Sequence, residues 1–391
     1  MLAETVAWLL ASAAASMLGW FVAELAAGLI RGKTEASERR ADLAVIVPAH
    51  DEAAGIAATL SELTALVPAS CILVVADNCS DDTAAIARAA GVRVVERREP
   101  GRRGKGFALA HAREVLTSDP PGAVMVLDAD CRLERGDPRL LAGRAVSSGA
   151  AIQSENLQLA GRGDSPIVQI GAFAFFVMNV LRSRGLQRLG GGTILQGTGM
   201  VFGWALFARL PLATGNAVED LDMTLQLARM GVPVWLDDRC RVTSASPGRS
   251  AHLEQRRRWE QGFIRMMVHG LPLLASGLAR GSRLRSAIAA HMLVPPLALL
   301  MVVTGALLTL GAAAAAGGLT TWGPATLLAG ALAFASSAVV AAWFVAGREI
   351  LALRTLLLAP LYVAAKVPLY LGLVSRSPVK WTRTAREVQD D

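Results

Sequence analysis

Charged residues are scarce in this 391-residue chain. They make up 18% of the sequence, whereas apolar residues make up 53% and the mean hydropathy is +0.42. Such a composition excludes an intrinsically disordered chain and a fibrous protein. The apolar residues are concentrated towards the two ends, with a mixed-charge block between them. The sequence therefore predicts a membrane protein that carries one soluble domain.

Cysteines, histidines and aromatic residues are also few. The four cysteines contain no CxxC pair and the five histidines share no ligand spacing, which argues against a zinc site or a disulfide framework and favours reduced thiols. GxSxG and HExxH signatures are absent, so serine-hydrolase and zinc-peptidase chemistry have no support. Aromatic residues make up 5%, too few for a base-stacking surface. We expect the net charge of +7 to face an anionic donor and membrane lipids, not nucleic acid.

A long apolar run opens the chain. Residues 5–30 are almost wholly apolar or small, long enough to cross the roughly 30 Å of hydrocarbon in a bilayer. Basic residues follow this run at 31, 33, 39 and 40, so the positive-inside rule predicts an N-terminus outside the inner (plasma) membrane and a cytosolic soluble domain. A cleaved signal peptide would carry such charges before its apolar run. Glu24 is expected at the interface or against another helix.

Apolar character returns after about residue 285. Residues 288–316 and 325–346 predict two further crossings. The run 356–374 is interrupted by two prolines and a lysine and is followed by basic residues, so we expect it in the inner interface. A crossing by this last run stays open as the alternative.

The central block alternates short β-branched runs with helical stretches, which predicts an α/β domain with a mostly parallel sheet. Predicted strands cover 42–48, 71–77, 92–97 and 123–130, and predicted helices cover 56–66, 83–90 and 107–116. The predicted organisation is an N-terminal transmembrane helix (1–31), a catalytic domain (42–248), amphipathic interface helices (249–285), transmembrane and interfacial helices (286–375) and a basic cytosolic tail (376–391).

Three acidic groups stand where this pattern places strand ends or helix starts. Asp77 ends one predicted strand, Asp128 and Asp130 end another, and Glu219 with Asp220 opens a helical stretch. Ligands of such sheets bind at the carboxyl ends of strands, and an Asp-x-Asp pair can approach one hard cation such as Mg or Mn. Each group has a structural alternative: a helix cap for the first, a solvated loop for the second, and favourable charge at a helix N-terminus for the third.

Two basic segments could bind phosphate. Residues 101–106 combine three glycines with Lys105 but lack P-loop spacing, so a simple basic loop is the alternative. Gln255, Arg258 and Trp259 have i, i+3, i+4 spacing and would share one helix face. They could hold a diphosphate and stack on a sugar ring. The alternative is an interfacial amphipathic helix.

These motifs occur in a specific order along residues 42 to about 265. The series is Pro48-Ala-His-Asp-Glu52, Asp77, Arg103-Gly-Lys105-Gly, Asp128-Ala-Asp130, Gly197-Thr-Gly199, Glu219-Asp220 and Gln255-Arg-Arg-Arg258-Trp259. It resembles family 2 glycosyltransferases of the GT-A fold. The resemblance is greatest to the membrane-integrated branch that contains cellulose, chitin and hyaluronan synthases and ceramide glucosyltransferases. Two positions depart from that pattern: Asp51 stands where asparagine is usual, and Val218 where threonine often precedes Glu-Asp.

The resemblance implies a role for each motif. Glu52 and Asp77 would hold the nucleoside of a sugar nucleotide, Asp130 would bind its diphosphate through Mg or Mn, and Asp220 would be the general base. The other implied donor-binding residues are Pro48, Lys105, Asp128, Gln255 and Arg258. The implied acceptor-binding residues are Gly197, Thr198, Gly199, Glu219 and Trp259.

The predicted function is inverting transfer of a sugar, with a UDP-linked donor expected, to a saccharide or lipid-linked acceptor at the cytosolic membrane face. Separate positions for cation and base favour single displacement, in which an α-linked donor gives a β-linked product. The reaction could extend a polysaccharide, with a second copy or an export partner completing a channel. Transfer of one sugar to ceramide, diacylglycerol or polyprenyl phosphate is the close alternative, and a non-catalytic membrane scaffold is a further one.

Overall fold

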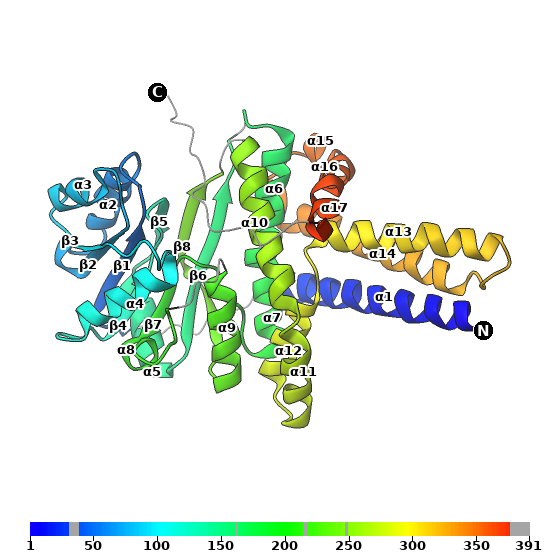
Figure 1. The fold of residues 1–391 in the computed structure, drawn as a ribbon, viewed down its shortest axis with the longest axis horizontal. Coiled ribbons are helices and arrows are strands. Elements are labelled where there is room, and N and C mark those ends of the chain that lie inside the picture. Colours follow the sequence, from blue (N-terminus) through cyan, green and yellow to red (C-terminus); the bar gives the residue numbers. More distant parts are fainter. Residues whose placement is uncertain (31–38, 162, 214–217, 247–248, 376–391) are drawn as a thin grey trace. The chain divides into compact units, whose positions relative to one another are not determined.

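The computed structural model describes residues 1–30, 39–161, 163–213, 218–246 and 249–375 (Figure 1). The chain forms two compact units. An α/β unit comprises Gly32–Ala160 and Gly191–Gln255, and a helical unit comprises Met1–Arg31, Gly161–Gly190 and Arg256–Val379. The predicted basic tail at 376–391 and the basic residues at 31 and 33 lie outside the described residues.

One eight-stranded sheet forms the centre of the α/β unit, in the order β3-β2-β1-β4-β7-β6-β8-β5. The strands are β1 Leu43–Ala49, β2 Ile72–Asp77, β3 Arg93–Arg97, β4 Ala123–Val126, β5 Cys131–Arg135, β6 Ala151–Leu159, β7 Met200–Gly203 and β8 Val234–Ala245. The first four are parallel, and β7 runs antiparallel to β4 and β6. The strand predicted over 123–130 ends at Val126, because the chain turns through Asp128 into β5.

Helices pack on both faces of this sheet because alternate strand residues point to opposite sides. Val45 and Val47 belong to the core beneath α2 (Ile56–Thr64), α3 (Thr83–Ala89) and α5 (Pro138–Ser148). Ile46 belongs to the opposite core, beneath α4 (Lys105–Leu116), α8 (Trp204–Phe207) and α9 (Glu219–Met230). Burial of each such side chain stabilises the fold by about 1.5–3 kcal/mol. The predicted layered α/β arrangement is therefore present.

The helical unit contains most of the apolar residues. Its helices are α1 Leu2–Leu29, α6 Pro166–Phe176, the π-helical turn η2 Val177–Arg182, α7 Ser183–Gly190, the part of α10 (Arg249–Met267) from Arg256, α11 Gly270–Ala279, α12 Arg283–Leu293, α13 Leu297–Ala316, α14 Gly323–Ala342, the π-helical turn η3 Trp343–Gly347, α15 Leu353–Leu356, α16 Ala359–Ala365 and α17 Val367–Ser375. Helix α1 packs against α14, α7 and α13.

Five helical stretches of the described chain are long and apolar enough to cross a membrane. They are Leu2–Leu29, Pro166–Gly190, Leu297–Ala316, Gly323–Gly347 and Leu353–Tyr370, and the bent pair α10–α11 makes a sixth candidate. The sequence analysis missed Pro166–Gly190, because polar residues interrupt its apolar run and two-thirds of its most apolar window is buried inside the protein. The stretch Leu353–Tyr370 also qualifies, and its predicted interfacial location stays a prediction.

Glu24 lies against other helices, as predicted. Its carboxylate is fully buried and lies 2.6 Å from Arg182 Nη2 and 2.8 Å from His291 Nδ1. Trp20 Nε1 donates a further hydrogen bond to it over 2.7 Å. The backbones approach closely here, since a Cβ on Gly185 would stand 1.7 Å from the Glu24 carbonyl oxygen. A buried acidic group is tolerated because a cation and hydrogen-bond donors surround it.

Candidate active site

Lys105, the first residue of α4, connects three other segments of the α/β unit. Its Nζ donates to the carboxylate of Asp128 in the turn after β4 and to the carbonyl oxygen of Gly197 at 2.8 Å. The same atom lies 3.9 Å from Glu219 Oε1, at the start of α9. The structure therefore brings together predicted site residues that are more than ninety positions apart in the chain.

Asp220 completes this group. A Cβ added to Gly197 would stand 3.7 Å from Asp220 Oδ2. The Asp220 carboxylate therefore lies close to the same glycine whose carbonyl oxygen accepts the hydrogen bond from Lys105. Burial, followed by the charge of Glu219, raises the pKa of Asp220 to about 7. Burial also raises the pKa of Glu219, against the opposing effect of Lys105. A carboxyl group with this pKa can accept a proton near neutral pH.

The loop that carries Gly197–Gly199 is held from β6. Gln153 is fully buried, and its Nε2 donates to the Thr198 carbonyl oxygen at 2.8 Å. Thr198 Oγ1 in turn accepts the Asp128 backbone N–H at 3.1 Å. Gly199 has a φ of +67°, and a Cβ there would stand 1.9 Å from Ser154 Oγ, so this position requires glycine. The sequence analysis missed Gln153, whose signal is a polar residue inside a buried strand.

Asp128 and Asp130 stand next to Cys131 at the end of β4. One ligand atom from each residue lies within 4.8 Å of the other two. Burial and the neighbouring carboxylates raise the pKa of the Cys131 thiol well above its usual range, so the thiolate that a metal would need is disfavoured. The two carboxylates supply the oxygen ligands that hard cations prefer. The donor set therefore fits Mg or Mn, with Asp130 the exposed member.

Three predicted donor residues lie at β1, β2 and the following loop. Asp77 is buried, and its Oδ1 pairs with Arg97 Nη1 at 2.6 Å. Pro48 is paired in register with β2, and the Glu52 backbone N–H donates to Thr83 Oγ1 at 2.7 Å. Asp77 thus has an internal partner in this structure, and the predicted contacts of all three residues with a nucleoside stay predictions.

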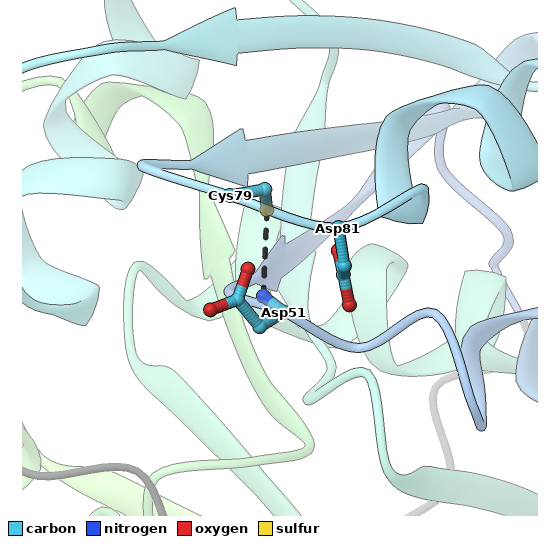
Figure 2. Close-up of side chains that lie close together, drawn as sticks. All are labelled: Asp51, Cys79 and Asp81. Atoms are coloured by element: carbon cyan, nitrogen blue, oxygen red, sulfur yellow. Dashed lines mark hydrogen bonds between the residues drawn. The ribbon is translucent and has the colours of Figure 1, made fainter.

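A second acidic cluster lies in the loops that follow β1 and β2. Asp51, Cys79 and Asp81 gather at the ends of the first two strands, and the Asp51 backbone N–H points to Cys79 Sγ at 3.5 Å (Figure 2). Ser80 donates its backbone N–H to Asp51 Oδ1 at 2.6 Å, and Ala53 donates to Asp81 Oδ2 at 3.0 Å. Because the carboxylates accept backbone N–H groups, they stabilise the two loops against each other. Asp51, which stands where asparagine is usual in the motif, therefore has a structural role.

Helix α10 carries the last motif. Gln255 Oε1 accepts a hydrogen bond from Gln158 Nε2 at 3.2 Å, within the α/β unit. Arg258 and Trp259 belong to the helical unit, where the Trp259 ring lies 6.0 Å from that of Phe175. The predicted contacts of these residues with donor and acceptor stay predictions.

Acidic strand ends, a lysine that joins them and a carboxyl group with a raised pKa define an enzyme-like site on an α/β domain. The profile of the family described as "Glycosyltransferase like family 2" matches residues 40–262. The chain therefore belongs to this family and is a glycosyltransferase, as the motif series predicted. No curated protein matches the chain significantly.

One solved structure has a similar fold over most of the chain. The mannosyltransferase PcManGT from Pyrobaculum calidifontis, in complex with GDP-Man and Mn2+, has 19% identity and a TM-score of 0.52; the match covers 93% of this chain and 95% of that one. Glucosyl-3-phosphoglycerate synthase from Mycobacterium tuberculosis, with Mn2+, UDP and glucosyl-3-phosphoglycerate, has 22% identity and a TM-score of 0.34, covering 52% and 70%. The family match and the first of these similarities confirm the predicted GT-A fold.

Proposed function

We propose that this protein is a membrane-bound inverting glycosyltransferase that uses a nucleotide sugar, a divalent cation and a hydroxyl acceptor. The single observation that carries the proposal is the convergence of Lys105, Asp128, Glu219 and Asp220 within the α/β unit. PcManGT is in complex with Mn2+ and GDP-Man, and the mycobacterial synthase is in complex with Mn2+ and UDP. These complexes support a divalent cation, Mg or Mn, and a UDP- or GDP-linked donor.

Positive charge would stabilise the leaving group on the donor side of the reaction. Breaking the bond between the anomeric carbon and a nucleoside diphosphate builds negative charge on the leaving phosphate. Asp130 and Asp128 would hold a divalent cation, which would supply Lewis acidity towards that charge. Lys105 is the ammonium group nearest these carboxylates in the described α/β unit, and it would orient the diphosphate while Asp128 keeps it in place.

The acceptor side would be served by Asp220. As the acceptor hydroxyl attacks the anomeric carbon, its proton passes to a carboxylate on the side opposite the leaving group. The hydroxyl oxygen forms the new bond to carbon, the phosphate oxygen leaves with its electron pair, and Asp220 keeps the proton. One displacement of this kind inverts the anomeric centre, so an α-linked donor gives a β-linked product.

A donor screen tests the proposal directly. The full chain in lipid nanodiscs is incubated with Mn2+ and a panel of UDP and GDP sugars, and both nucleotide release and product mass are measured. One added sugar on a lipid identifies single transfer, whereas a ladder of products identifies polymer extension. Donor binding without turnover of any sugar would identify a non-catalytic scaffold and refute the proposal.

Asp220→Asn isolates the base. We expect transfer to fall by about 10²–10⁴-fold, the usual contribution of a positioned general base, while binding of the nucleotide with Mn2+ stays within about twofold. Asp222→Asn is the matched control, because this carboxylate lies in the same first turn of α9 and accepts a hydrogen bond from Gln226 at 3.2 Å. Equal loss of transfer and donor binding in Asp220→Asn would contradict the assignment.

A further inference from the structure

Strand β6 has polar residues at buried positions along one face. Ser154, Asn156 and Gln158 point to the same side of the sheet, because successive strand residues alternate between its faces. Ser154 has a clear structural task, since its Oγ donates to the Gly199 carbonyl oxygen at 2.9 Å. Asn156 is 4% exposed and Gln158 is 5% exposed, although asparagine is depleted in strands and glutamine is seldom fully buried. We call Asn156 and Gln158 the amide pair.

The amide pair makes long hydrogen bonds within the protein. Asn156 Nδ2 donates to the Gln196 carbonyl oxygen at 3.4 Å, and Gln158 Nε2 donates to Gln255 Oε1 at 3.2 Å. The usual distance for such a bond is about 2.9–3.0 Å. These bonds are therefore weaker than those that hold the loop to the start of β6, and a ligand can replace them at a lower cost in free energy.

One atom of the amide pair is unpartnered. Gln158 Oε1 is buried and has no hydrogen-bond partner among the described residues. Buried polar atoms are hydrogen-bonded in the great majority of cases, because a lost partner costs free energy. Methionine or leucine would fill the same space without that cost. The carboxamide oxygen therefore suits a hydroxyl group that a ligand supplies.

The amide pair lies beside the residues proposed for the acceptor side. Gln196, which accepts the hydrogen bond from Asn156, directly precedes Gly197, and a Cβ on Gly197 would stand 3.7 Å from Asp220 Oδ2. All of these residues belong to the α/β unit. Gln196 and Asp220 are partly exposed, so the pair lies one contact below an accessible surface that includes the proposed base.

We propose that the amide pair binds hydroxyl groups of a saccharide acceptor, on the sugar unit next to the one whose hydroxyl gives its proton to Asp220. The inference rests on the proposed function, since it names the chemistry of the acceptor. A carboxamide both donates and accepts hydrogen bonds, as a sugar hydroxyl does. The pair is uncharged, whereas phosphate is recognised by arginine or lysine.

The spacing of the amide pair favours a saccharide over a lipid. Its two residues are two positions apart on one strand face, a separation of about 7 Å. Such a pair suits a molecule that carries hydroxyl groups at several places along its length. A diacylglycerol offers a single hydroxyl, which is the one that would react. A lipid acceptor is therefore an outcome that the experiment has to separate.

The first test compares acceptors of two lengths. The full chain in nanodiscs, with Mn2+ and the donor identified in the screen, is incubated with the methyl glycosides of glucose, mannose and N-acetylglucosamine and with the matching β-1,4-linked disaccharides. We expect kcat/KM to be roughly five- to hundredfold higher for the disaccharide of the accepted sugar, the effect of two added hydrogen bonds. Equal values for the two lengths would overturn the inference.

Variants of the amide pair form the second test. Asn156→Leu and Gln158→Met remove the amides with little change in size, and each should reduce the disaccharide preference about two- to tenfold. The double variant should lose the preference, while the monosaccharide rate and the donor KM stay unchanged. Gln226→Met is the matched control, because it removes a carboxamide that binds Asp222 on α9 of the same unit. A double variant that keeps the wild-type preference would refute the site, including one in which both rates fall equally.

Saturation-transfer difference NMR measures binding without turnover. The wild-type chain in nanodiscs, with Mg2+ and UDP, is mixed with the methyl disaccharide. Protons of both sugar units should receive saturation, because both would contact the protein. Saturation of one unit alone would contradict the subsite, and this measurement does not depend on how well the variants fold.

Failure of this inference is distinguishable from failure of the proposed function. If the wild-type protein transfers sugar only to dioleoylglycerol, or to both acceptor lengths equally, the amide pair is not a saccharide subsite and the glycosyltransferase proposal stands. If no sugar nucleotide is turned over, the proposed function fails first, and the inference that rests on it fails with it.

Discussion

The pH dependence of transfer should report Asp220. Burial and the charge of Glu219 raise the pKa of Asp220 to about 7, and a general base must be deprotonated to act. At pH 6 about a tenth of the Asp220 side chains are ionised, and at pH 8 about nine-tenths, by the ordinary titration curve around that pKa. We therefore expect kcat/KM to increase about tenfold from pH 6 to pH 8 and to level off above it.

Two substitutions should move this titration in opposite directions. Glu219→Gln removes a negative neighbour that raises the pKa of Asp220, so the midpoint should move below pH 7. Lys105→Met removes a cation that lowers this pKa, so the midpoint should move above pH 7. The midpoint is the relevant measurement, since both substitutions can also change the absolute rate.

The assay measures initial rates of nucleotide release at donor concentrations far below KM, from pH 5.5 to 9, at constant ionic strength. Under these conditions the profile reports groups of the free enzyme. Asp222→Asn, in the same helical turn, should leave the midpoint in place. A flat profile, or a midpoint that stays fixed in both Glu219→Gln and Lys105→Met, would refute the role of Asp220.

Two further predictions concern the cation and the helical unit. Asp130→Asn should weaken Mn2+-dependent nucleotide binding at least tenfold in a calorimetric titration, because a neutral amide replaces a charged oxygen ligand; an unchanged Mn2+ titration would remove Asp130 from the metal site. Glu24→Gln should lower stability by about 3 kcal/mol, because Arg182 keeps a buried charge without its partner. The melting temperature in nanodiscs measures this loss, and Glu24→Gln combined with Arg182→Met should recover part of it, whereas no recovery would show that the pair is not the cause.

The strands and helices of the α/β unit were largely predictable because their signals are local. Buried β-branched runs gave β1, β2 and β3 to within one residue at each end. The sequence predicts that α4 begins at residue 107, whereas the helix begins at Lys105. Gly104, directly before it, has a φ of +127°, a backbone conformation that glycine adopts readily. The strands β6, β7 and β8 were not predicted, because polar residues inside β6 obscure its pattern and its pairings with β7 and β8 are long-range.

The candidate site was predictable as a set of residues but not as a set of contacts. The resemblance implied that Lys105 lies near the donor phosphates, which stays a prediction, but nothing in the sequence indicated its contacts with Asp128 and the Gly197 carbonyl oxygen. Such contacts join residues that are distant in the chain, and no local pattern encodes them. Gln153 has a local signal, a polar residue inside a buried strand, but its partner Thr198 lies on a loop more than forty positions away.

The charges of these separate motifs determine one another's pKa values. Asp128, Glu219 and Asp220 place three carboxylates around a single ammonium group, so Lys105 can neutralise only one of them. The carboxylates raise the pKa of Lys105 against the effect of its burial, which keeps the cation charged. The remaining like-charge repulsion adds to burial in raising the pKa of Asp220. The geometry that places three carboxylates around Lys105 therefore also raises the pKa of Asp220, and neither property follows from any one motif alone.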